Sequence, residues 1–453
     1  MDVLNPADNR KIGEVQDFTE DMVHDTVGML EKGFTEWSVQ NPTARSKILF
    51  KAAEIMRQEV EGLASVLTAE QGKPLQEARY EILGAAAVMD FYASVAGTIS
   101  GQTLPKADYG YAFTKKTPLG VCGAIIPWNM PALIMAWKIC PALVSGNTMI
   151  LKTASATPLT NIGMADILFR AGLPRDVLAV ITGSGAVAGA AIAADERIGH
   201  LSFTGSVETG DRIAKTINPR KTRLTLELGG SDPMIVCEDA DMERAVKGAI
   251  SGRFFNCGQT CTAVKRLFVA ETIADEFISQ LKKEAEAIKV GNGAAEGTTM
   301  GPLNSASGVR DMEDAVKSIE DGGRMVTGGT RLEGPGNFYS PTLIADPEPG
   351  NMLMTEEIFG PVLPIVRFGD LSEAIRMAND SKFGLGASIW TKDIETACEA
   401  ADRIECGILW INRHMRIPPE VPFGGSKNSG IGRENGLKAL EQYLTEKTVI
   451  LTP

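Results

Sequence analysis

The chain has 453 residues, of which 44% are hydrophobic and 23% are charged, and its formal net charge is -12. This length exceeds one ordinary hydrophobic core, so we expect two or three domains. The excess of acidic residues argues against nucleic acid and against an anionic membrane surface as natural partners.

The cysteines and the apolar segments favour the cytoplasm as the compartment. The seven cysteines are odd in number and widely scattered, which fits reduced thiols rather than a disulfide framework. Residues 118–151 form the most hydrophobic region, but prolines and polar residues interrupt it, so we expect buried core rather than a membrane span. The first ten residues lack the apolar core of a signal peptide.

The predicted elements alternate between helices and strands. Apolar residues at helical spacing predict amphipathic helices over 43–69 and 75–95. Helices then separate five predicted strands, at 121–126, 148–152, 177–181, 198–204 and 223–228. Such alternation is typical of a parallel sheet with helices on both faces.

A second α/β unit follows Gly230. Its predicted elements are strands at 233–236 and 267–269 and helices at 242–254, 273–288 and 308–321. Segments 98–118 and 440–453 also have strand character, but neither extends these two sheets. We therefore expect an α/β fold with two doubly wound parallel-sheet domains and a separate strand pair.

Two glycine-containing turns and one lysine follow predicted strands. In Gly183–Gly189 the third glycine comes one position late for a dinucleotide fingerprint, so a tight turn is the favoured interpretation. Gly205 and Ser206 lie where helix-start amides hold phosphate, with a helix cap by Ser206 as the alternative. Lys152 ends a strand, where cofactors bind, although a surface lysine is the plainer interpretation.

Three side chains are candidates for catalysis. Asn129 lies between two prolines in Pro-Trp-Asn-Met-Pro, and a stiff amide suits an oxyanion donor. Glu227 has apolar neighbours that should raise its pKa, which suits a general base. Cys261 supplies a thiol nucleophile. The plainer alternatives are a turn asparagine and a buried, ion-paired glutamate.

Cys257 lies four positions before Cys261, which raises the question of a metal site. The chain offers no second pair at zinc spacing, and its three histidines are scattered, so we expect no metal. The same shortage of histidines argues against cysteine-protease chemistry. Inert packing is the favoured role of Cys257, with redox activity as the alternative.

Taken together, the motifs resemble the aldehyde dehydrogenase superfamily over about residues 3–450. The stretches that carry the resemblance are Pro-Trp-Asn-Met-Pro, Phe-Thr-Gly-Ser, Leu-Glu-Leu-Gly-Gly, Gly-Gln-Thr-Cys, Glu-Glu-Ile-Phe-Gly-Pro and Pro-Phe-Gly-Gly-Ser-Lys. The resemblance implies a cofactor domain (1–97 and 119–229), a catalytic domain (230–438) and a bridge (98–118 and 440–453) that pairs subunits into homodimers or homotetramers. We expect the short hairpin that usually begins the family's chains to be absent here.

The resemblance also implies roles for individual residues. Cys261 would attack the aldehyde, Asn129 and the Cys261 amide would hold the oxyanion, and Glu227 would activate water to hydrolyse the thioester. Lys138 would assist proton transfer. The residues expected to contact the cofactor are Trp128, Lys152, Ser155, Gly205, Ser206, Leu228, Glu357 and Phe359.

Ser155 points to the choice of cofactor. Members of the family that prefer NAD usually have a glutamate at this position, and its charge would repel a ribose 2′-phosphate. Ser155 together with Lys152 accepts that phosphate, so we expect NADP to be preferred and NAD to be possible.

The substrate is expected to be a small aldehyde. Arg413 and Arg416 lie in a segment that corresponds to a substrate-tunnel loop, where they would hold a carboxylate, against solvated arginines as the alternative. The chain looks most like the shorter succinate-semialdehyde dehydrogenases, so we expect a semialdehyde. The alternatives are a hydroxyaldehyde (lactaldehyde or glyceraldehyde), a broad aldehyde range, or a non-catalytic binding protein. Glu227 argues against transfer of the acyl group to CoA.

Overall fold

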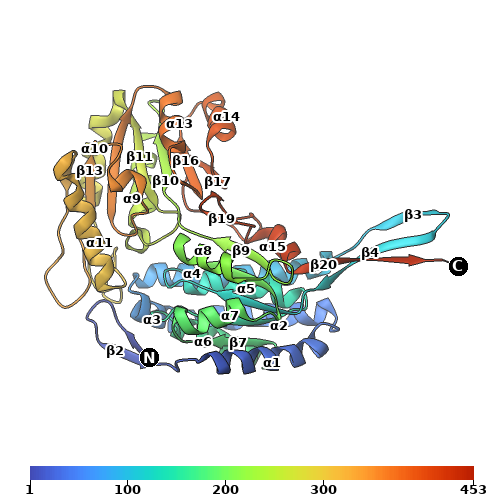
Figure 1. The fold of residues 1–453 in the computed structure, drawn as a ribbon. Helices are drawn as coiled ribbons and strands as arrows, with labels where there is room; N and C mark the ends of the chain where they lie inside the picture. The colour runs from blue at the N-terminus through green and yellow to red at the C-terminus, as the bar shows by residue number, and fades with distance from the viewer. Residues whose placement is uncertain (453) are drawn as a thin grey trace.

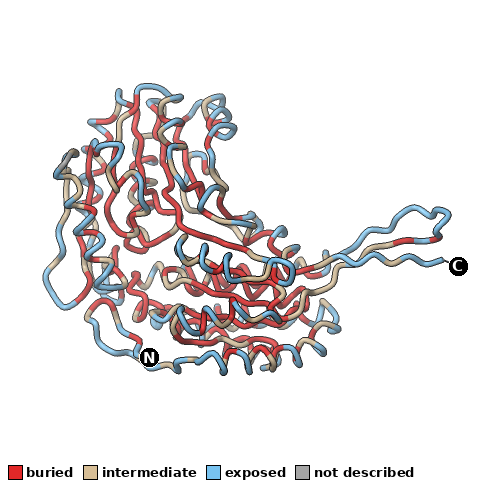
Figure 2. Tube along the Cα trace, viewed as in Figure 1, coloured by how far each residue is buried: buried red, intermediate tan, exposed pale blue. Residues whose placement is uncertain are grey.

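The computed structural model describes residues 1–452, which form two α/β bodies and a narrow arm (Figure 1). The bodies meet at an angle, and the arm projects from one of them with the C-terminus near its tip. Buried residues follow the sheets of both bodies, whereas the arm is largely exposed (Figure 2). The α/β fold expected from the sequence is confirmed.

The first body is built on a six-stranded sheet of order β19-β9-β8-β5-β6-β7. Its strands are β5 (Val121–Ile125), β6 (Thr148–Lys152), β7 (Leu178–Ile181), β8 (Ile198–Thr204), β9 (Arg223–Glu227) and β19 (Gly430–Ile431). Strands β5 to β9 pair in parallel, and β19 returns from far along the chain to pair antiparallel with β9. All five predicted strands are confirmed, with small differences at their ends.

Helices cover both faces of this sheet, because residues alternate between faces along each strand. Cys122 and Ala124 belong to one buried cluster, and Val121 and Ile125 belong to another. The helices are α1 (Glu20–Trp37), α2 (Pro42–Gln58), α3 (Val60–Gln71), α4 (Leu75–Val95), α5 (Pro131–Val144), α6 (Leu159–Ala171), α7 (Ala190–Ala194), α8 (Val207–Thr216), α15 (Gly436–Gln442), the 3-10 turn η1 (Ala96–Thr98) and the π-helical turn η2 (Gly185–Gly189).

The second body contains a seven-stranded sheet of order β12-β13-β14-β11-β10-β16-β17. Its strands are β10 (Asp232–Val236), β11 (Val264–Ala270), β12 (Arg324–Thr327), β13 (Thr342–Ala345), β14 (Val362–Phe368), β16 (Gly386–Trp390) and β17 (Ile408–Ile411), with a separate pair β15 (Phe383–Gly384) and β18 (Ser426–Lys427). All neighbours in the large sheet are parallel except β12 and β13.

The helices of the second body flank this sheet. They are α9 (Met242–Phe254), α10 (Ala274–Glu286), α11 (Ala306–Lys317), α12 (Met352–Thr355), α13 (Leu371–Asn379) and α14 (Ile394–Arg403), with 3-10 turns η3 (Phe255–Gly258), η4 (Glu271–Ile273) and η5 (Ser318–Asp321). The predicted helix over 242–254 is confirmed with both of its ends, and the restart of the pattern after Gly230 is confirmed as a second sheet.

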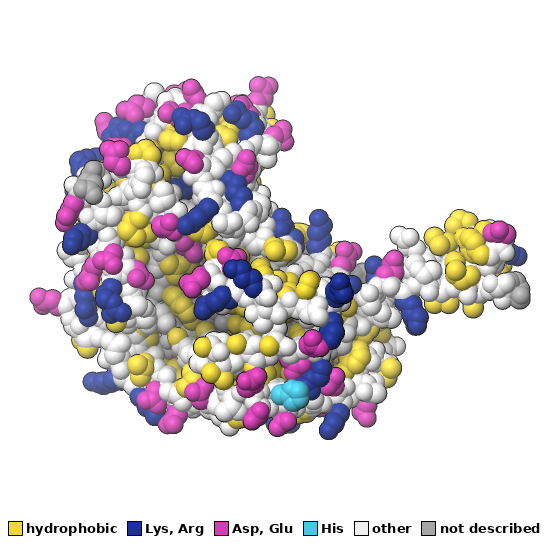
Figure 3. Space-filling model, viewed as in Figure 1, with side chains coloured by type: hydrophobic (Ala, Val, Ile, Leu, Met, Phe, Trp, Pro, Cys, Tyr) yellow, Lys and Arg dark blue, Asp and Glu magenta, His cyan; other side chains and the backbone are white. Residues whose placement is uncertain are grey.

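The arm is a three-stranded antiparallel sheet of order β20-β4-β3 that is separate from both bodies. Its strands are β3 (Thr103–Ala107), β4 (Gly110–Pro118) and β20 (Leu444–Leu451). Hydrophobic side chains gather near its tip (Figure 3), and the large apolar residues exposed on these strands and on the turn between β3 and β4 are Leu104, Tyr109, Tyr111, Ile450 and Leu451. The strand character of both segments is confirmed, although the arm contains three strands rather than two.

The expectation of a chain without an N-terminal hairpin is wrong. Strands β1 (Asp2–Leu4) and β2 (Lys11–Glu14) pair antiparallel. Of these seven residues only Val3 is buried, so the alternation that usually marks a strand is missing from the sequence. Asn9 adopts φ 59° in the connecting turn, and its Nδ2 donates to the carbonyl of Pro335 at 2.5 Å, which fastens the hairpin to the second body.

Two expected absences concern membranes and metals. No helix within residues 1–452 is long and apolar enough to cross a membrane. The same residues contain no cluster of three or more His, Cys, Asp or Glu side chains placed to hold a metal ion.

Candidate active site

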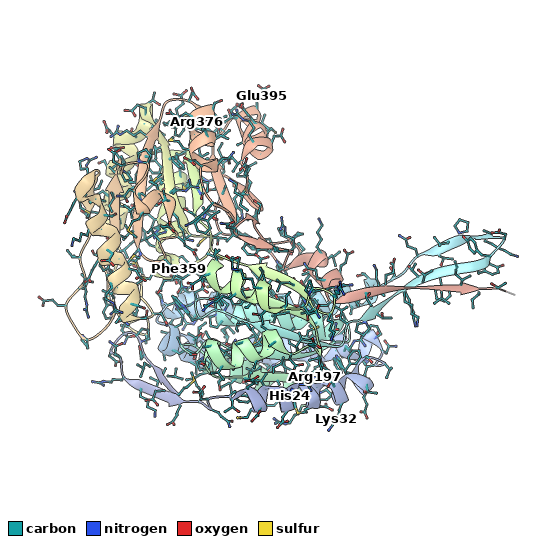
Figure 4. The ribbon with its side chains drawn as sticks, viewed as in Figure 1. His24, Lys32, Arg197, Phe359, Arg376 and Glu395 are labelled. Atoms are coloured by element: carbon teal, nitrogen blue, oxygen red, sulfur yellow. The ribbon has the colours of Figure 1, made fainter. Side chains whose placement is uncertain are left out.

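A cavity of about 210 Å³ lies where the two bodies meet. Figure 4 labels Phe359, which lies at this junction. Nine of the predicted site residues line the cavity together, although 231 positions separate the first from the last: Trp128, Asn129, Gly205, Ser206, Glu227, Leu228, Cys261, Glu357 and Phe359. Thiol, amide and carboxylate therefore share one small space.

Cys261 follows a strained turn that ends α9. Asn256 and Cys257 adopt φ of 52° and 57°, in the left-handed region that residues with side chains rarely occupy, and such strain gathers at functional sites. The Cys261 thiol is partly exposed, and burial is the main cause that raises its pKa, to about 12; Lys265 opposes this shift. The thiol therefore carries its proton at neutral pH in the ligand-free protein.

A buried polar network fixes Asn129. Its side-chain Nδ2 donates to the backbone carbonyl of Gln259 at 2.9 Å. The backbone carbonyl of Asn129 accepts from Lys73 Nζ at 2.8 Å and from Asn256 Nδ2 at 2.9 Å. Lys73 is in turn paired with Glu81, whose other oxygen accepts from the Ala132 amide at the start of α5. The amide has a second Nδ2 hydrogen left to donate into the cavity.

Glu227 has the opposite surroundings. It is 2% exposed, and neither of its carboxylate oxygens has a hydrogen-bond partner within the described part of the chain. Burial and then the nearby Glu434 raise its pKa well above the usual range, while Lys138 and Arg433 oppose the shift. The alternative of an ion-paired glutamate is therefore not what the structure contains.

Lys138 lies outside the cavity lining, but behind it. Its Nζ is fully buried, donates to Ser202 Oγ at 2.7 Å and forms an ion pair with Glu434. Ser202 also donates to Glu434 at 2.6 Å. Glu434, which sequence reasoning missed, lies 207 positions after Glu227, and no local pattern marks it.

Gly229 and Gly230 lack side chains, which allows Glu357 and the Cys261 peptide to lie close to the backbone that follows Glu227. A Cβ at Gly229 would lie 2.2 Å from Glu357 Oε2, and one at Gly230 would lie 2.8 Å from the Cys261 carbonyl. The Gly230 amide donates to Glu357 Oε1 at 3.1 Å. Leu-Glu-Leu-Gly-Gly therefore presents the base and also makes room for the nucleophile's peptide and for Glu357.

The aromatic and helix-start residues complete the lining. The rings of Trp128 and Phe359 meet edge to face, with centroids 5.7 Å apart. Ser206 caps α8 by accepting from the Thr209 amide at 3.3 Å, so the cap predicted as the alternative is present, in a residue that also faces the cavity.

Lys152 and Ser155 lie outside this cavity, near a second one. Lys152 is buried, which lowers its pKa to about 8, and donates to the Thr153 carbonyl at 3.0 Å, so the surface-lysine alternative is wrong. Ser155 is exposed and donates to the Gly183 carbonyl at 3.1 Å. The Ser155 hydrogen bond ties the segment after β6 to the glycine turn after β7.

The second cavity, of about 420 Å³, includes that glycine turn in its wall. A Cβ at Gly185 would meet open space, and one at Gly189 would lie 3.6 Å from Lys152 Cδ. The remaining walls come from α7, α8 and two strands, with Phe203 and Arg212 among them. A narrow space with small residues on one side and a cation beside it fits a flat nucleoside base, a possibility that the tight-turn interpretation set aside.

Arg413 and Arg416 do not line the catalytic cavity. Both are exposed, and within residues 1–452 neither guanidinium forms an ion pair or a side-chain hydrogen bond. Their loop nevertheless lies against the nucleophile's flanks, because His414 Nε2 donates to the Thr262 carbonyl at 2.7 Å and Thr260 Oγ1 lies 3.4 Å from Met415 Sδ.

Comparisons with known proteins agree with this geometry. Residues 1–449 match the aldehyde dehydrogenase family. Betaine aldehyde dehydrogenase 1 of Rhizobium meliloti is 39% identical over 99% of this chain and 93% of its own length. An NADP-dependent enzyme from E. coli superposes with a TM-score of 0.98 at 36% identity, over 100% of this chain and 94% of that one.

A lactaldehyde dehydrogenase structure superposes with a TM-score of 0.97 at 34% identity, over 100% of this chain and 96% of that one. The names of these relatives span several aldehydes, so they support the superfamily but not the succinate-semialdehyde type in particular. The chain belongs to the aldehyde dehydrogenase family, whose reaction is the NAD(P)-dependent oxidation of an aldehyde to a carboxylic acid.

Proposed function

We propose that this protein is a hydrolytic aldehyde dehydrogenase that prefers NADP and oxidises a small semialdehyde such as succinate semialdehyde. The observation that carries the proposal is the single cavity that contains the Cys261 thiol, the Asn129 amide and the Glu227 carboxylate. Acyl chemistry at an aldehyde carbon needs a nucleophile, an oxyanion donor and a base, and these three side chains supply them.

Cys261 is the nucleophile in this proposal. Glu227, whose raised pKa makes it a stronger base than an ordinary carboxylate, takes the thiol proton within the same cavity. Sulfur then forms a bond to the aldehyde carbon, and the carbonyl oxygen becomes an oxyanion held by the free Nδ2 hydrogen of Asn129 and the Cys261 amide. The product of this step is a thiohemiacetal on Cys261.

Glu227 acts a second time, on the thioester. It removes a proton from water, the water oxygen bonds to the acyl carbon, and the carbon–sulfur bond breaks to release the acid and the Cys261 thiolate. We assign the onward transfer of its proton to Lys138, Ser202 and Glu434, which are hydrogen-bonded to one another, because Lys138 and Glu434 are close enough to shift the pKa of Glu227. Lys138 thus assists proton transfer without lining the cavity.

We assign the cofactor contacts to the two cavities. Trp128, Gly205, Ser206, Leu228, Glu357 and Phe359 would contact the nicotinamide ribose and the pyrophosphate, and the cavity beside Lys152 would hold the adenosine. When bound, an oxidised nicotinamide supplies the acceptor for the hydride that leaves the thiohemiacetal carbon.

The preference for NADP rests on Ser155 and Lys152. Ser155 is exposed and follows the buried Lys152 by three positions, and no carboxylate occupies position 155. The structural similarity to an NADP-dependent enzyme supports the same choice. We expect Ser155→Glu to shift the ratio of kcat/KM values toward NAD by about ten-fold, which corresponds to ~1.4 kcal/mol. An unchanged ratio would contradict the assignment.

The choice of a semialdehyde rests on the small cavity and on the loop that carries Arg413 and Arg416. His414 and Met415 of that loop contact the residues on both sides of Cys261, which supports a role for the neighbouring arginines at the approach to the thiol. A small hydroxyaldehyde is the second candidate, favoured by the similarity to a lactaldehyde dehydrogenase. Arg413→Ala with Arg416→Ala should raise KM for succinate semialdehyde and leave KM for lactaldehyde unchanged.

We further propose the division of labour along the chain. Residues 1–97 and 119–229 bind the cofactor and residues 230–438 carry the nucleophile. The bridge of residues 98–118 and 440–453, which includes the strands of the arm, joins subunits into a homodimer or homotetramer; its last residue, 453, lies outside the described residues. The exposed apolar residues near the tip of the arm support the last assignment, since a second copy would cover them.

The test is the formation of reduced nicotinamide, followed by absorbance, for wild type and Cys261→Ala. NADP and NAD are each combined with succinate semialdehyde, lactaldehyde, glyceraldehyde and a medium-chain aldehyde. Turnover that requires the thiol and is fastest with NADP and succinate semialdehyde is expected. A folded wild type that binds NADP but turns over none of these would favour a binding role.

A further inference from the structure

Lys265 is out of place in its strand. All seven residues of β11 are buried, and five of them, the residues other than Lys265 and Arg266, are apolar. An ammonium without exposure is expensive unless its charge and all three of its donors are satisfied. Its partners therefore indicate why the lysine is there.

Those partners belong to the active site. Lys265 Nζ donates to the Thr260 carbonyl at 3.0 Å, to the Cys261 carbonyl at 2.6 Å and to Glu357 Oε1 at 3.1 Å. It also lies 5.6 Å from the centroid of the Phe359 ring, within range of a cation–π contact. One buried cation thus touches the nucleophile's own peptide and two residues assigned to the nicotinamide ribose.

The arrangement leaves one oxygen of Glu357 available. Oε1 is held twice, by Lys265 and by the Gly230 amide at 3.1 Å. Oε2 has no hydrogen-bond partner in the described part of the chain, and the side chain is 23% exposed at the cavity. An anchored carboxylate with one free oxygen is a prepared acceptor for a hydroxyl group.

We propose that Lys265 is a positioning residue that holds the Cys261 peptide and the Glu357 carboxylate in one fixed geometry, and so couples the nucleophile to the bound cofactor. The proposal rests on the proposed function for the assignment of Glu357 to the nicotinamide ribose. The physical link itself is the set of three hydrogen bonds from one ammonium, none of which requires a ligand.

The charges of Lys265 and Glu357 also act on the Cys261 sulfur. The charged groups that face Cys261 are Lys265, which favours its thiolate, and Asp232, Glu357 and Glu227, which oppose it. Asp232 pairs through its backbone with Val264, next to Lys265, and its Oδ2 has no hydrogen-bond partner among residues 1–452. A change at either end of the Lys265–Glu357 pair must therefore be felt at the thiol.

The test uses Lys265→Met, which keeps an unbranched apolar stem and removes the ammonium group, and Glu357→Gln. The matched control is Lys382→Met, which removes a lysine from an exposed ion pair of 2.6 Å with Glu356, the residue before Glu357. Neither Lys382 nor Glu356 lines the cavity. Alkylation of Cys261 by iodoacetamide is followed by mass spectrometry at pH 8, and binding of NADPH by fluorescence. Neither measurement needs an aldehyde.

We expect Lys265→Met to slow alkylation about ten-fold, because the thiolate loses its favourable neighbour. We also expect it to weaken NADPH binding about ten-fold, because Glu357 Oε1 loses one of its two hydrogen bonds and its only charged partner among the described residues. Glu357→Gln should weaken NADPH binding by a similar factor and speed alkylation a few-fold, and the double variant should bind NADPH no more weakly than Glu357→Gln alone. The control should match wild type.

Unchanged alkylation and binding in Lys265→Met, or losses of binding that multiply in the double variant, would overturn the proposal. If Lys265→Met does not fold, Glu357→Gln decides alone, since an unchanged alkylation rate there would mean that the carboxylate and the thiol are not coupled. If the wild type oxidises no aldehyde while these shifts occur, the proposed function fails and the link between Lys265, Cys261 and Glu357 stands.

Discussion

The two sides of the catalytic cavity are built in opposite ways. On one side, Lys73 and Asn256 donate hydrogen bonds to the backbone carbonyl of Asn129, and the Asn129 side chain donates to the backbone carbonyl of Gln259. Glu227 on the other side is equally buried, yet its carboxylate has no hydrogen-bond partner in the part of the chain described. The contrast matches two tasks.

A donor that stabilises developing charge works best when it is aimed beforehand, because no energy is then needed to reorient it during the reaction. A base has to collect a proton from one place and release it in another, so a carboxylate without fixed partners keeps both its freedom and its raised pKa. The predictions below are ordered by the size of the expected effect, and each disturbs one side and leaves the other intact.

Glu227→Gln removes the base and keeps the shape of the side chain. We expect steady-state turnover to fall about 10³-fold, within the range for loss of a general base. Formation of the thioester should still yield one burst of reduced nicotinamide, provided that cofactor and aldehyde are mixed at a pH high enough to ionise the thiol. Stopped-flow absorbance measures both phases, and steady turnover at the wild-type rate would remove Glu227 from hydrolysis.

Asn129→Ala removes the aimed donor. The loss in kcat should be about 10²- to 10³-fold, as for other single oxyanion donors, with a smaller change in KM. Steady-state kinetics with the best aldehyde provide the measurement. If KM rises and kcat stays unchanged, the Asn129 amide binds the ground state of the substrate rather than the oxyanion.

Asn256→Ala tests whether the network, rather than Asn129 alone, matters. Asn256 Nδ2 supports the carbonyls of Asn129 and Gln259 without lining the cavity. A loss in kcat of about ten-fold is expected, and the loss should disappear when Asn129→Ala is already present. If the kcat losses of the two single variants multiply in the double variant, Asn256 does not act by orienting the Asn129 side-chain amide.

Glu434→Gln removes a charge near Glu227 without changing Glu227 itself, and it should have the smallest effect of the four variants. The Glu434 charge raises the pKa of Glu227, so its removal should lower that pKa, and the unpaired Lys138 should act in the same direction. Glu227 acts as a base when ionised, so the acid limb of the pH profile of kcat should move to lower pH. An acid limb that stays in place or moves to higher pH would show that the Glu434 charge does not raise the pKa of Glu227.

The sequence was informative where function depends on short motifs. Asn129, Glu227 and Cys261 each lie in a local pattern whose chemistry follows from residue type, and the strands around them in the sequence alternate clearly with helices. Even the arm could be expected, because its strands have the right composition and fit neither sheet.

What could not be predicted depends on contacts between distant residues. Lys73 reaches Asn129 across 56 positions, and Lys138 reaches Glu434 across 296. No spacing rule connects such pairs. Lys265 did leave a signal, since a lysine next to Arg266 within an apolar strand predicts a buried charge that needs partners.

The most direct test of the account is mass spectrometry of Glu227→Gln after incubation with NADP and succinate semialdehyde. The incubation uses a pH high enough to ionise the Cys261 thiol, because Glu227→Gln cannot take the thiol proton. If Asn129 then holds the oxyanion and Glu227 is needed for hydrolysis, Cys261 should carry one succinyl group as a thioester, and Cys261→Ala in the same background should carry none. An unmodified Cys261 together with continued release of acid would contradict the account, because hydrolysis would then proceed without the carboxylate that the cavity leaves free.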